Sequence, residues 1–323
     1  MKAVLCRQLG GPEVLELSDI DEPTPKPGEV IVRVKVAGLN FFDTLMLAGK
    51  YQFKPELPFS PGAECAGVVE AIGDGVTGWA LGERVASFGG NCCREKVAVP
   101  AIKLLRIPDG VTDEQAAGLV VTYGTSLHAL KDRARLKPGE TLAVLGAAGG
   151  VGLAAVEIGK AMGARVIACA SSADKLALAR AHGADTLLDY AAEDLRDGLR
   201  RLTNGMGVDV VYDPVGGELS EKALRSIAWQ GRFLVIGFAA GGIPKIPLNL
   251  ALLKGCDILG VFWGSFVERD PKAHQANMAQ IFAWMREKKL SAHVHGVYEL
   301  ARTAQALGVL AGRKAKGKVL VRI

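Results

Sequence analysis

The sequence predicts an α/β protein in which a doubly wound parallel sheet is inserted into a second unit built on a small antiparallel barrel. From Thr141 onward, apolar strands alternate with amphipathic helices. A glycine-rich turn joins the first of these strands to the next helix. Roughly the first 115 residues instead hold short strands separated by Pro and Gly. A chain of 323 residues is long enough for one large or two ordinary domains.

The N-terminal part has the pattern of a small barrel. A Pro-rich segment over residues 22–29 precedes an alternating apolar strand from Val30 to Ala37. A further strand is predicted from Ala63 to Ile72. Pro and Gly between short strands turn the chain sharply, as antiparallel barrels require.

The central part has the pattern of a parallel sheet covered by helices on both faces. We expect strands over Thr141 to Leu145, Arg165 to Ala170, Thr186 to Asp189, Val208 to Asp213, Arg232 to Ile236 and Asp257 to Val261. We expect helices over Val151 to Met162, Asp174 to His182, Asp194 to Thr203 and Ser220 to Ala228. Right-handed crossovers make such an alternation a complete doubly wound unit.

The C-terminal elements are too few for a domain of their own. They comprise helices over Pro271 to Lys288 and Leu300 to Leu310, and strands over Val294 to Val297 and Lys318 to Arg322. We expect them to return to the N-terminal unit. This predicts a catalytic domain of residues 1–120 and 265–323 and a nucleotide-binding domain of residues 121–264, with the substrate site in the cleft between them.

Composition excludes several classes of protein. No apolar stretch approaches membrane-spanning length and the N-terminus is too short in apolar residues for a secretory signal, so a cytoplasmic location is expected. The six cysteines lack the spacing of a disulfide framework. The net charge of +5 is modest, and Lys and Arg are spread through the chain except in the segment from Arg313 to Lys318, so a nucleic-acid partner is poorly supported.

The turn after the first central strand predicts a dinucleotide site. The run from Val144 to Gly152 contains Ala-x-Gly-x-x-Gly, with Ala147 in place of the first glycine of the usual pattern. Small residues let a pyrophosphate approach the unpaired N–H groups at the start of the helix. The expected binding residues are Ala148, Gly149, Gly150, Val151 and Gly152.

The end of the second central strand favours NADPH over NADH. An NAD site would place a carboxylate there for the adenosine ribose, whereas this strand ends in Ser171 and Ser172, followed by Lys175. Two hydroxyls, a lysine and a helix N-terminus suit a 2′-phosphate. The alternative is that Ser172 only caps the helix and Lys175 is a solvated surface residue. Asp174 comes late for a ribose ligand and suits the first turn of the helix equally well.

These motifs resemble those of a known superfamily. The segments Pro61 to Val69, Gly82 to Val85, Gly146 to Gly152, Asp213 to Gly217 and Gly231 to Gly237 occur in the order and spacing of the medium-chain dehydrogenases/reductases. The chain is most similar to their zinc-independent branch, the NADPH:quinone oxidoreductases that include the zeta-crystallin-like proteins, over essentially its whole length.

The resemblance implies a GroES-like catalytic domain, an inserted Rossmann domain and a homodimer. It implies that Asn40, Asp43, Tyr51 and Thr122 lie near the nicotinamide. It further implies that Ser171, Lys175 and Tyr190 bind the adenosine end. The segment Val261 to Gly264, including Phe262 and Trp263, would flank the nicotinamide together with Phe238, and Arg313 would assist the phosphate.

No metal site is expected. Zinc needs thiolate or imidazole ligands at fixed positions, and where zinc-dependent relatives place a Cys and a His this sequence has Asn40 and Ala63. Cys92 and Cys93 are adjacent and predict a buried pair of small residues. His293 and His295 would share one face of a strand, but two ligands are too few for a site.

Without a Lewis acid, reduction of an electron-poor acceptor is easier than oxidation of an unactivated alcohol. The predicted function is therefore NADPH-dependent reduction of quinones or related conjugated carbonyls. Asn40 or a hydroxyl would hydrogen-bond the acceptor oxygen, and Tyr51 would donate the proton or merely pack on the cofactor. Asp43 could equally be an ordinary helix residue. The alternatives are an enoyl-thioester or enone (2-alkenal) reductase, and a non-catalytic NADPH-binding sensor.

Overall fold

The chain divides within helix α2 (Asp113–Leu127). Unit 1 comprises Met1–Val121 and Ser291–Ile323, and unit 2 comprises Thr122–Leu290. The computed structural model describes residues 1–323. None of the helices combines the length and the hydrophobicity of a membrane-spanning segment.

The boundary at the C-terminal side differs from the expected one, which began the returning segment at residue 265. In the structure, residues 265–290 group with unit 2. The reason is a set of polar contacts, since Asn277 of this segment donates to Asp132 over 2.8 Å and accepts from Lys131 over 2.9 Å. Sequence periodicity identifies such a helix but not the surface on which it packs.

Unit 2 contains a six-stranded parallel sheet in the order β10-β9-β8-β11-β12-β13, which confirms the predicted doubly wound arrangement. Its strands are β8 (Thr141–Leu145), β9 (Arg165–Ala170), β10 (Thr186–Asp189), β11 (Val208–Asp213), β12 (Ile227–Val235) and β13 (Asp257–Gly260). The central strands β8 and β11 are buried on both faces, as expected for near-continuous apolar runs.

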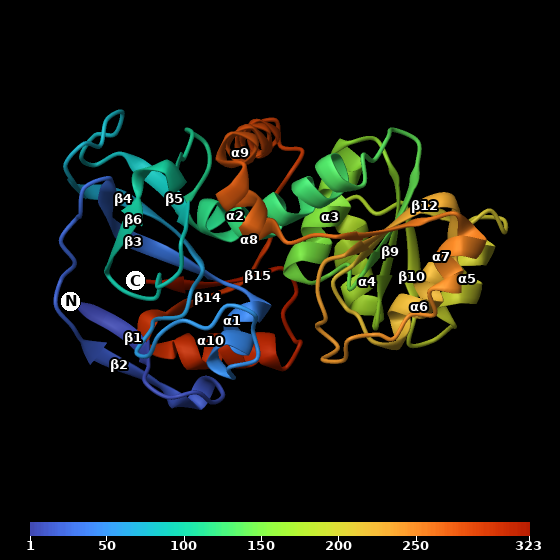
Figure 1. The fold of residues 1–323 in the computed structure, drawn as a ribbon, viewed down its shortest axis with the longest axis horizontal. Helices are drawn as coiled ribbons and strands as arrows, with labels where there is room; N and C mark the ends of the chain where they lie inside the picture. The colour runs from blue at the N-terminus through green and yellow to red at the C-terminus, as the bar shows by residue number, and fades with distance from the viewer. The chain divides into compact units, whose positions relative to one another are not determined.

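Helices cover both faces of this sheet, with α3 and α4 on one side and α5 and α6 on the other (Figure 1). The helices of unit 2 are the π-helical η3 (His128–Arg133), which continues α2, and α3 (Gly150–Ala161), α4 (Ala173–Ala181), α5 (Leu195–Leu202), α6 (Glu218–Arg225), α7 (Asn249–Lys254), α8 (Trp263–Arg269) and α9 (Pro271–Arg286). A core of apolar residues from β8, β9 and β11 packs under α5 and α6.

One predicted boundary in unit 2 is wrong. We expected a helix to Ala228 and a strand from Arg232, but α6 ends at Arg225 and β12 already begins at Ile227. The early part of β12 pairs through Ile227 with Val208, and a register shift follows before the regular pairing resumes. An irregular first pair of this kind leaves no alternating pattern in the sequence.

Unit 1 is built on a seven-stranded sheet of order β14-β15-β3-β4-β5-β7, with β6 also paired to β3, and on the two-stranded sheet β1-β2. Its strands are β1 (Lys2–Cys6), β2 (Leu15–Asp19), β3 (Glu29–Leu39), β4 (Glu64–Ile72), β5 (Arg84–Phe88), β6 (Lys96–Pro100), β7 (Leu104–Arg106), β14 (Val294–Glu299) and β15 (Lys318–Arg322). Its helices are α1 (Phe41–Leu47), α10 (Thr303–Ala311) and the short η1 (Pro12–Val14), η2 (Ala101–Lys103) and η4 (Leu300–Arg302).

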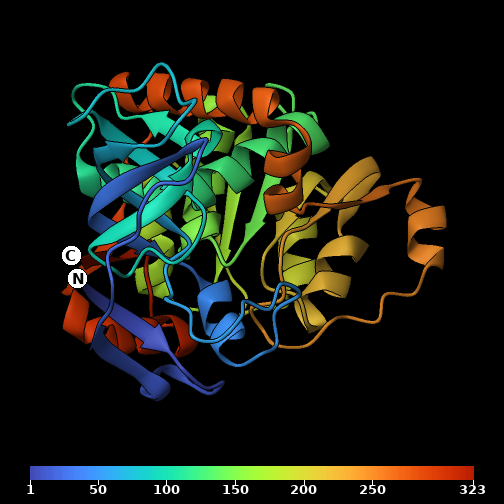
Figure 2. The same ribbon diagram turned by 60° about the vertical axis from the view of Figure 1, so that its left-hand side comes forward.

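Both ends of the chain contribute to unit 1. The last strand, β15, pairs antiparallel with β3 and parallel with β14. In both views the N-terminus and the C-terminus lie near each other (Figures 1 and 2). The pairing of β15 brings Lys318, at its first position, to the C-terminal end of β3 and the beginning of α1.

The pairing of β3 with β4 requires a glycine at position 67. A Cβ there would lie 2.2 Å from the Arg33 carbonyl oxygen, next to a register shift between the two strands. We therefore expect Gly67→Ala to destabilise unit 1 by about 1–3 kcal/mol, as overpacking of a well-packed core does. Thermal unfolding followed by circular dichroism measures the effect. Gly308→Ala in α10 is the matched control, because a Cβ added there would meet nothing within 4 Å. Equal unfolding midpoints for the two variants would contradict a steric requirement for glycine at position 67.

Candidate functional site

The glycine-rich turn between β8 and α3 leaves room for an anion at the start of the helix. Gly149 occupies the N-cap position in an extended conformation and offers no side chain to the first helical N–H groups. A Cβ at Gly152 would lie 2.2 Å from the carbonyl oxygen of Gly146, so the turn closes tightly against the helix. Unpaired N–H groups and the helix dipole attract phosphate at such a position. The geometry from Ala148 to Gly152 fits a dinucleotide pyrophosphate.

The predicted adenosine-end residues of unit 2 contact one another. The Lys175 ammonium donates to Ser171 Oγ over 3.3 Å. Tyr190 also hydrogen-bonds Ser171, and burial raises the pKa of this phenol, which stays protonated. Ser172 stands at the N-cap of α4 but its hydroxyl bonds to Asp174 instead of capping the helix. The cluster offers hydroxyl and ammonium donors, as a 2′-phosphate requires.

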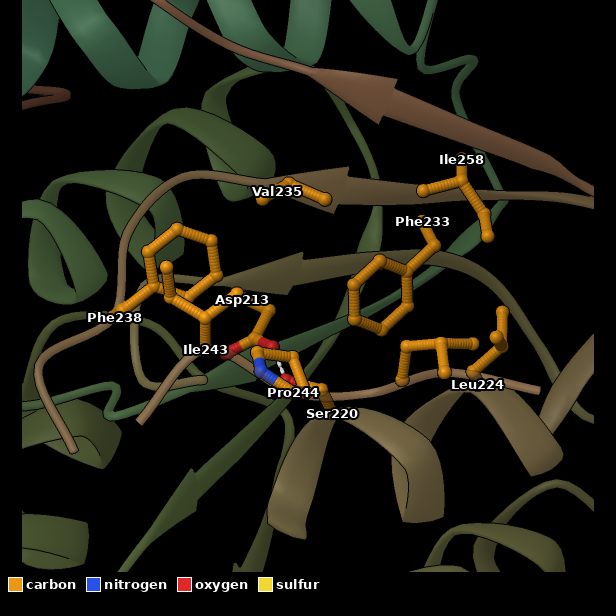
Figure 3. A pocket seen from close by; sticks show the side chains of 10 residues that line it. Asp213, Ser220, Leu224, Phe233, Val235, Phe238, Ile243, Pro244 and Ile258 are labelled. Carbon is orange, nitrogen blue, oxygen red and sulfur yellow. Dashed lines mark hydrogen bonds between the residues drawn. The ribbon is translucent and has the colours of Figure 1, made fainter. Parts of the chain in front are cut away.

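A small apolar cavity of about 150 Å³ lies beside the predicted nicotinamide residue Phe238 (Figure 3). Asp213 and Ser220 are its polar lining residues. The apolar lining residues are Leu224, Phe233, Val235, Phe238, Ile243, Pro244, Ile246 and Ile258.

Asp213 shapes the loop beside this cavity. One oxygen of its carboxylate accepts from the N–H groups of Val215 and Gly216 over 2.8 and 2.9 Å, and the other accepts from Ser220 over 2.5 Å. Burial raises the pKa of Asp213 against these hydrogen bonds. Both carboxylate oxygens thus accept hydrogen bonds from the protein itself, and Asp213 fixes the turn beside Phe238. The cavity is therefore lined mainly by apolar side chains, although a carboxylate lies at its edge.

Asn40 and Asp43 form a reciprocal pair at the start of α1 in unit 1. The Asn40 N–H donates to Asp43 Oδ2 over 2.7 Å, and the Asp43 N–H donates to the Asn40 carbonyl oxygen over 3.1 Å. The N–H of Gly62 donates to the other Asp43 oxygen over 3.1 Å. Burial raises the pKa of Asp43 to about 7, although these hydrogen bonds favour the carboxylate. Asp43 thereby fixes the backbone of Asn40 and of the loop at Gly62.

Glu64 and Lys318 form a buried ion pair beside Asn40, and neither was predicted as a site residue. Their side chains are 0% and 4% exposed, and Lys318 Nζ lies 2.5 Å from Glu64 Oε1. The Asn40 amide bridges the pair, since its Nδ2 donates to Glu64 over 2.9 Å and its Oδ1 accepts from Lys318 over 2.6 Å. The sequence does carry one signal, because Glu64 interrupts an otherwise small and apolar run in a buried strand.

The donors around Asn40 do not fit a zinc ion. No three His, Cys, Asp or Glu side chains come close enough to hold a metal. The cation beside Asn40 is the Lys318 ammonium, and Ala63 supplies no ligand atom. Cys92 and Cys93 are buried, as predicted for a pair of small core residues.

Tyr51 lies close to the Asn40 cluster within unit 1. Its ring stacks on Phe42 of α1, with centroids 5.3 Å apart. Burial and the nearby Asp43 raise the pKa of the phenol, so it remains protonated at neutral pH. Tyr51 thus keeps both of the roles predicted for it, proton donor and packing aromatic.

The remaining predicted residues differ in exposure. Thr122 is buried on α2, and Trp263 is buried with its ring against Gly124. Phe262 is 54% exposed at the N-cap of α8. Arg313 is exposed in unit 1, in a left-handed backbone conformation just after α10.

Family comparisons cover both units. The alcohol dehydrogenase GroES-like domain matches residues 26–109, and the zinc-binding dehydrogenase domain matches residues 150–283. The first match lies in unit 1 and the second in unit 2.

Individual relatives match the chain from end to end. It is 37% identical to the quinone oxidoreductase-like protein 2 homolog of Nematostella vectensis, covering 99% of this chain and 88% of that one. It is 36% identical to the quinone oxidoreductase of Pseudomonas aeruginosa, with 99% of both chains covered. The structure of Escherichia coli quinone oxidoreductase complexed with NADPH superimposes with a TM-score of 0.93 at 28% identity, covering all of both chains. The relatives and the two family domains agree with the α/β fold, which combines a GroES-like domain with a Rossmann domain. The chain therefore belongs to the quinone oxidoreductase family of the medium-chain dehydrogenases/reductases.

Proposed function

We propose that the protein is an NADPH-dependent quinone oxidoreductase that transfers hydride to quinones or related conjugated carbonyls without a metal ion. The observation that carries this proposal is the Asn40 amide, held between Lys318 and Glu64. The family resemblance puts a metal ligand of the zinc-dependent relatives at this position. An amide N–H can hydrogen-bond an oxygen on which negative charge develops. The names of the relatives above support the same activity.

In the proposed reaction, bound NADPH supplies a hydride from C4 of its nicotinamide. Asn40 hydrogen-bonds a carbonyl oxygen of the acceptor, and Tyr51 delivers the proton that completes reduction to the hydroquinone. A protonated phenol suits this role at neutral pH. Asp43 acts through the backbone of Asn40, since both of its oxygens accept from backbone N–H groups.

For the cofactor, we propose that Ser171, Lys175 and Tyr190 hold the 2′-phosphate end, with Ser172 beside them. The turn from Ala148 to Gly152 binds the pyrophosphate. The proposed nicotinamide-end residues are Asn40, Thr122, Phe238, Phe262 and Trp263, and Arg313 is proposed to assist the phosphate. The homodimer implied by the family resemblance and the cytoplasmic location expected from the composition stay predictions.

The activity itself gives the first test. We expect the protein to accelerate NADPH oxidation by 1,4-benzoquinone and naphthoquinones in stopped-flow absorbance measurements. The matched control is Gly152→Ala, whose added Cβ would lie 2.2 Å from the Gly146 carbonyl oxygen and distort the cofactor turn. Absence of any acceleration by the wild-type protein removes the proposal and favours a non-catalytic NADPH-binding sensor.

A second candidate, enone or enoyl-thioester reduction, is favoured by the protonated Tyr51 phenol, because an enolate needs a proton donor. We expect Tyr51→Phe to lower turnover of 2-alkenals and crotonyl-CoA by about 100-fold or more, the usual effect of losing a general acid. Quinone reduction should fall much less, because water can protonate a hydroquinone anion. Steady-state kinetics with both acceptors decides. Unchanged rates for both would leave Tyr51 only the packing role.

The cofactor preference depends on charge beside Ser171. We expect Lys175→Glu to reduce the preference for NADPH over NADH by about 10-fold or more, since it replaces a charge-assisted hydrogen bond with repulsion. The ratio of kcat/KM values for the two cofactors measures this. Lys272→Glu, an exposed substitution of the same kind in α9, is the control. If the ratio stays the same in Lys175→Glu, the proposed 2′-phosphate site is incorrect.

A further inference from the structure

The buried ion pair beside Asn40 is unusual for its depth. Both side chains are almost completely removed from solvent, and removing two charges from water is costly unless further hydrogen bonds satisfy them. Asn40 supplies such bonds to both members of the pair. The pair is also bound to the backbone, because Glu64 Oε2 accepts from the Val121 N–H over 2.8 Å.

The chemistry of the two ions determines which way the Asn40 amide points. An ammonium has only donors and an ionised carboxylate only acceptors, whereas an amide has both. Lys318 must therefore face Oδ1, and Glu64 must face Nδ2. A flipped amide would point its NH₂ group at the ammonium and its oxygen at the carboxylate, and would lose both hydrogen bonds.

The locked amide retains donor capacity. Nδ2 carries two hydrogens and makes one hydrogen bond, to Glu64. Oδ1 accepts from Lys318, and the Asn40 backbone is already fixed through Asp43. The remaining N–H is therefore the group that Asn40 can offer to another molecule.

We infer that Lys318 and Glu64 are positioning residues that lock the Asn40 amide as a hydrogen-bond donor, so that the site selects acceptors presenting a carbonyl oxygen over products presenting a phenolic O–H. This inference rests on the proposed quinone reduction and explains why the site would bind the quinone in preference to the hydroquinone. A quinone carbonyl has only lone pairs to offer, which match the free N–H. The hydroquinone oxygen also keeps lone pairs, but it is a weaker acceptor than a carbonyl oxygen, and its O–H finds no free acceptor on the locked amide. The hydroquinone product therefore binds the amide less well.

Glu64 extends this positioning to α2. Its Oε2 holds the N–H of Val121, immediately before Thr122. Gly38 permits the close approach, because a Cβ there would lie 2.2 Å from the Ala117 carbonyl oxygen and 2.6 Å from Glu64 Cγ. One carboxylate thus fixes both the amide of Asn40 and the backbone that leads into Thr122.

The kinetic test removes both charges together, because a single deletion would leave an unpaired buried ion and endanger folding. In Lys318→Met/Glu64→Gln we expect KM for 1,4-naphthoquinone to rise about 10-fold, the effect of losing one oriented hydrogen bond to the bound carbonyl oxygen. KM for NADPH should change much less than KM for the quinone, because the pyrophosphate turn and the proposed 2′-phosphate cluster of unit 2 stay intact. The thermal midpoint should be retained. The single variant Lys318→Arg keeps a donor-only cation opposite Asn40 Oδ1. Its KM for the quinone should lie much closer to the wild-type value than that of the double variant.

Lys35→Met is the matched control, because it removes a lysine of unit 1 that pairs with Asp113 at a partly exposed site. It should leave both KM values unchanged. An unchanged quinone KM in the double variant, or a parallel loss for quinone and NADPH without rescue by Lys318→Arg, would overturn the inference.

A measurement without turnover separates this inference from the proposed function. The measurement is NMR of isotope-labelled protein with NADP⁺ bound. One hydrogen of the Asn40 side-chain amide should be protected from exchange with solvent, and the chemical shift of the other should change on adding duroquinone. Durohydroquinone, added anaerobically, should shift it less. Equal shifts for the two compounds, or an amide without a protected hydrogen, would contradict the locked donor. Absent turnover together with the expected NMR behaviour would contradict only the proposed function.

Discussion

The Glu64 carboxylate is the constraint on which the arrangement of unit 1 depends. It contacts the last strand through Lys318, the start of α1 through Asn40 and helix α2 through Val121. These three groups are far apart in the chain and come from three different elements. A single buried acceptor that satisfies a lysine, an amide and a backbone N–H explains why a carboxylate is tolerated inside an apolar strand.

The two units provide different parts of the proposed chemistry. Unit 2 presents small residues and helix N–H groups where a dinucleotide can approach, together with hydroxyls and a lysine at the end of β9. Unit 1 presents the Asn40 amide, whose orientation is set by the neighbouring charges of Lys318 and Glu64. An amide N–H stabilises charge on a substrate oxygen best where water is excluded. Asn40 is only 6% exposed and therefore lies in such an environment.

The sequence predicted the parts of this structure that depend on local pattern. Strands β8 to β11 begin and end where their apolar runs begin and end, and the glycine turn follows β8 as the spacing requires. The ion pair could not be found in this way, because Glu64 and Lys318 are 254 residues apart and meet only when β15 pairs with β3. The same limit applies to α9, whose packing against residues of η3 sets the extent of unit 2. The individual cofactor contacts stay predictions, since they depend on a bound molecule.

The central claim is that the acceptor is polarised by protein hydrogen-bond donors and not by a metal ion. The most direct measurement is the zinc content of freshly purified protein by mass spectrometry, combined with quinone turnover before and after dialysis against a strong chelator. The account predicts far less than stoichiometric zinc and the same turnover after chelation. Stoichiometric zinc that leaves on chelation together with the activity would contradict it.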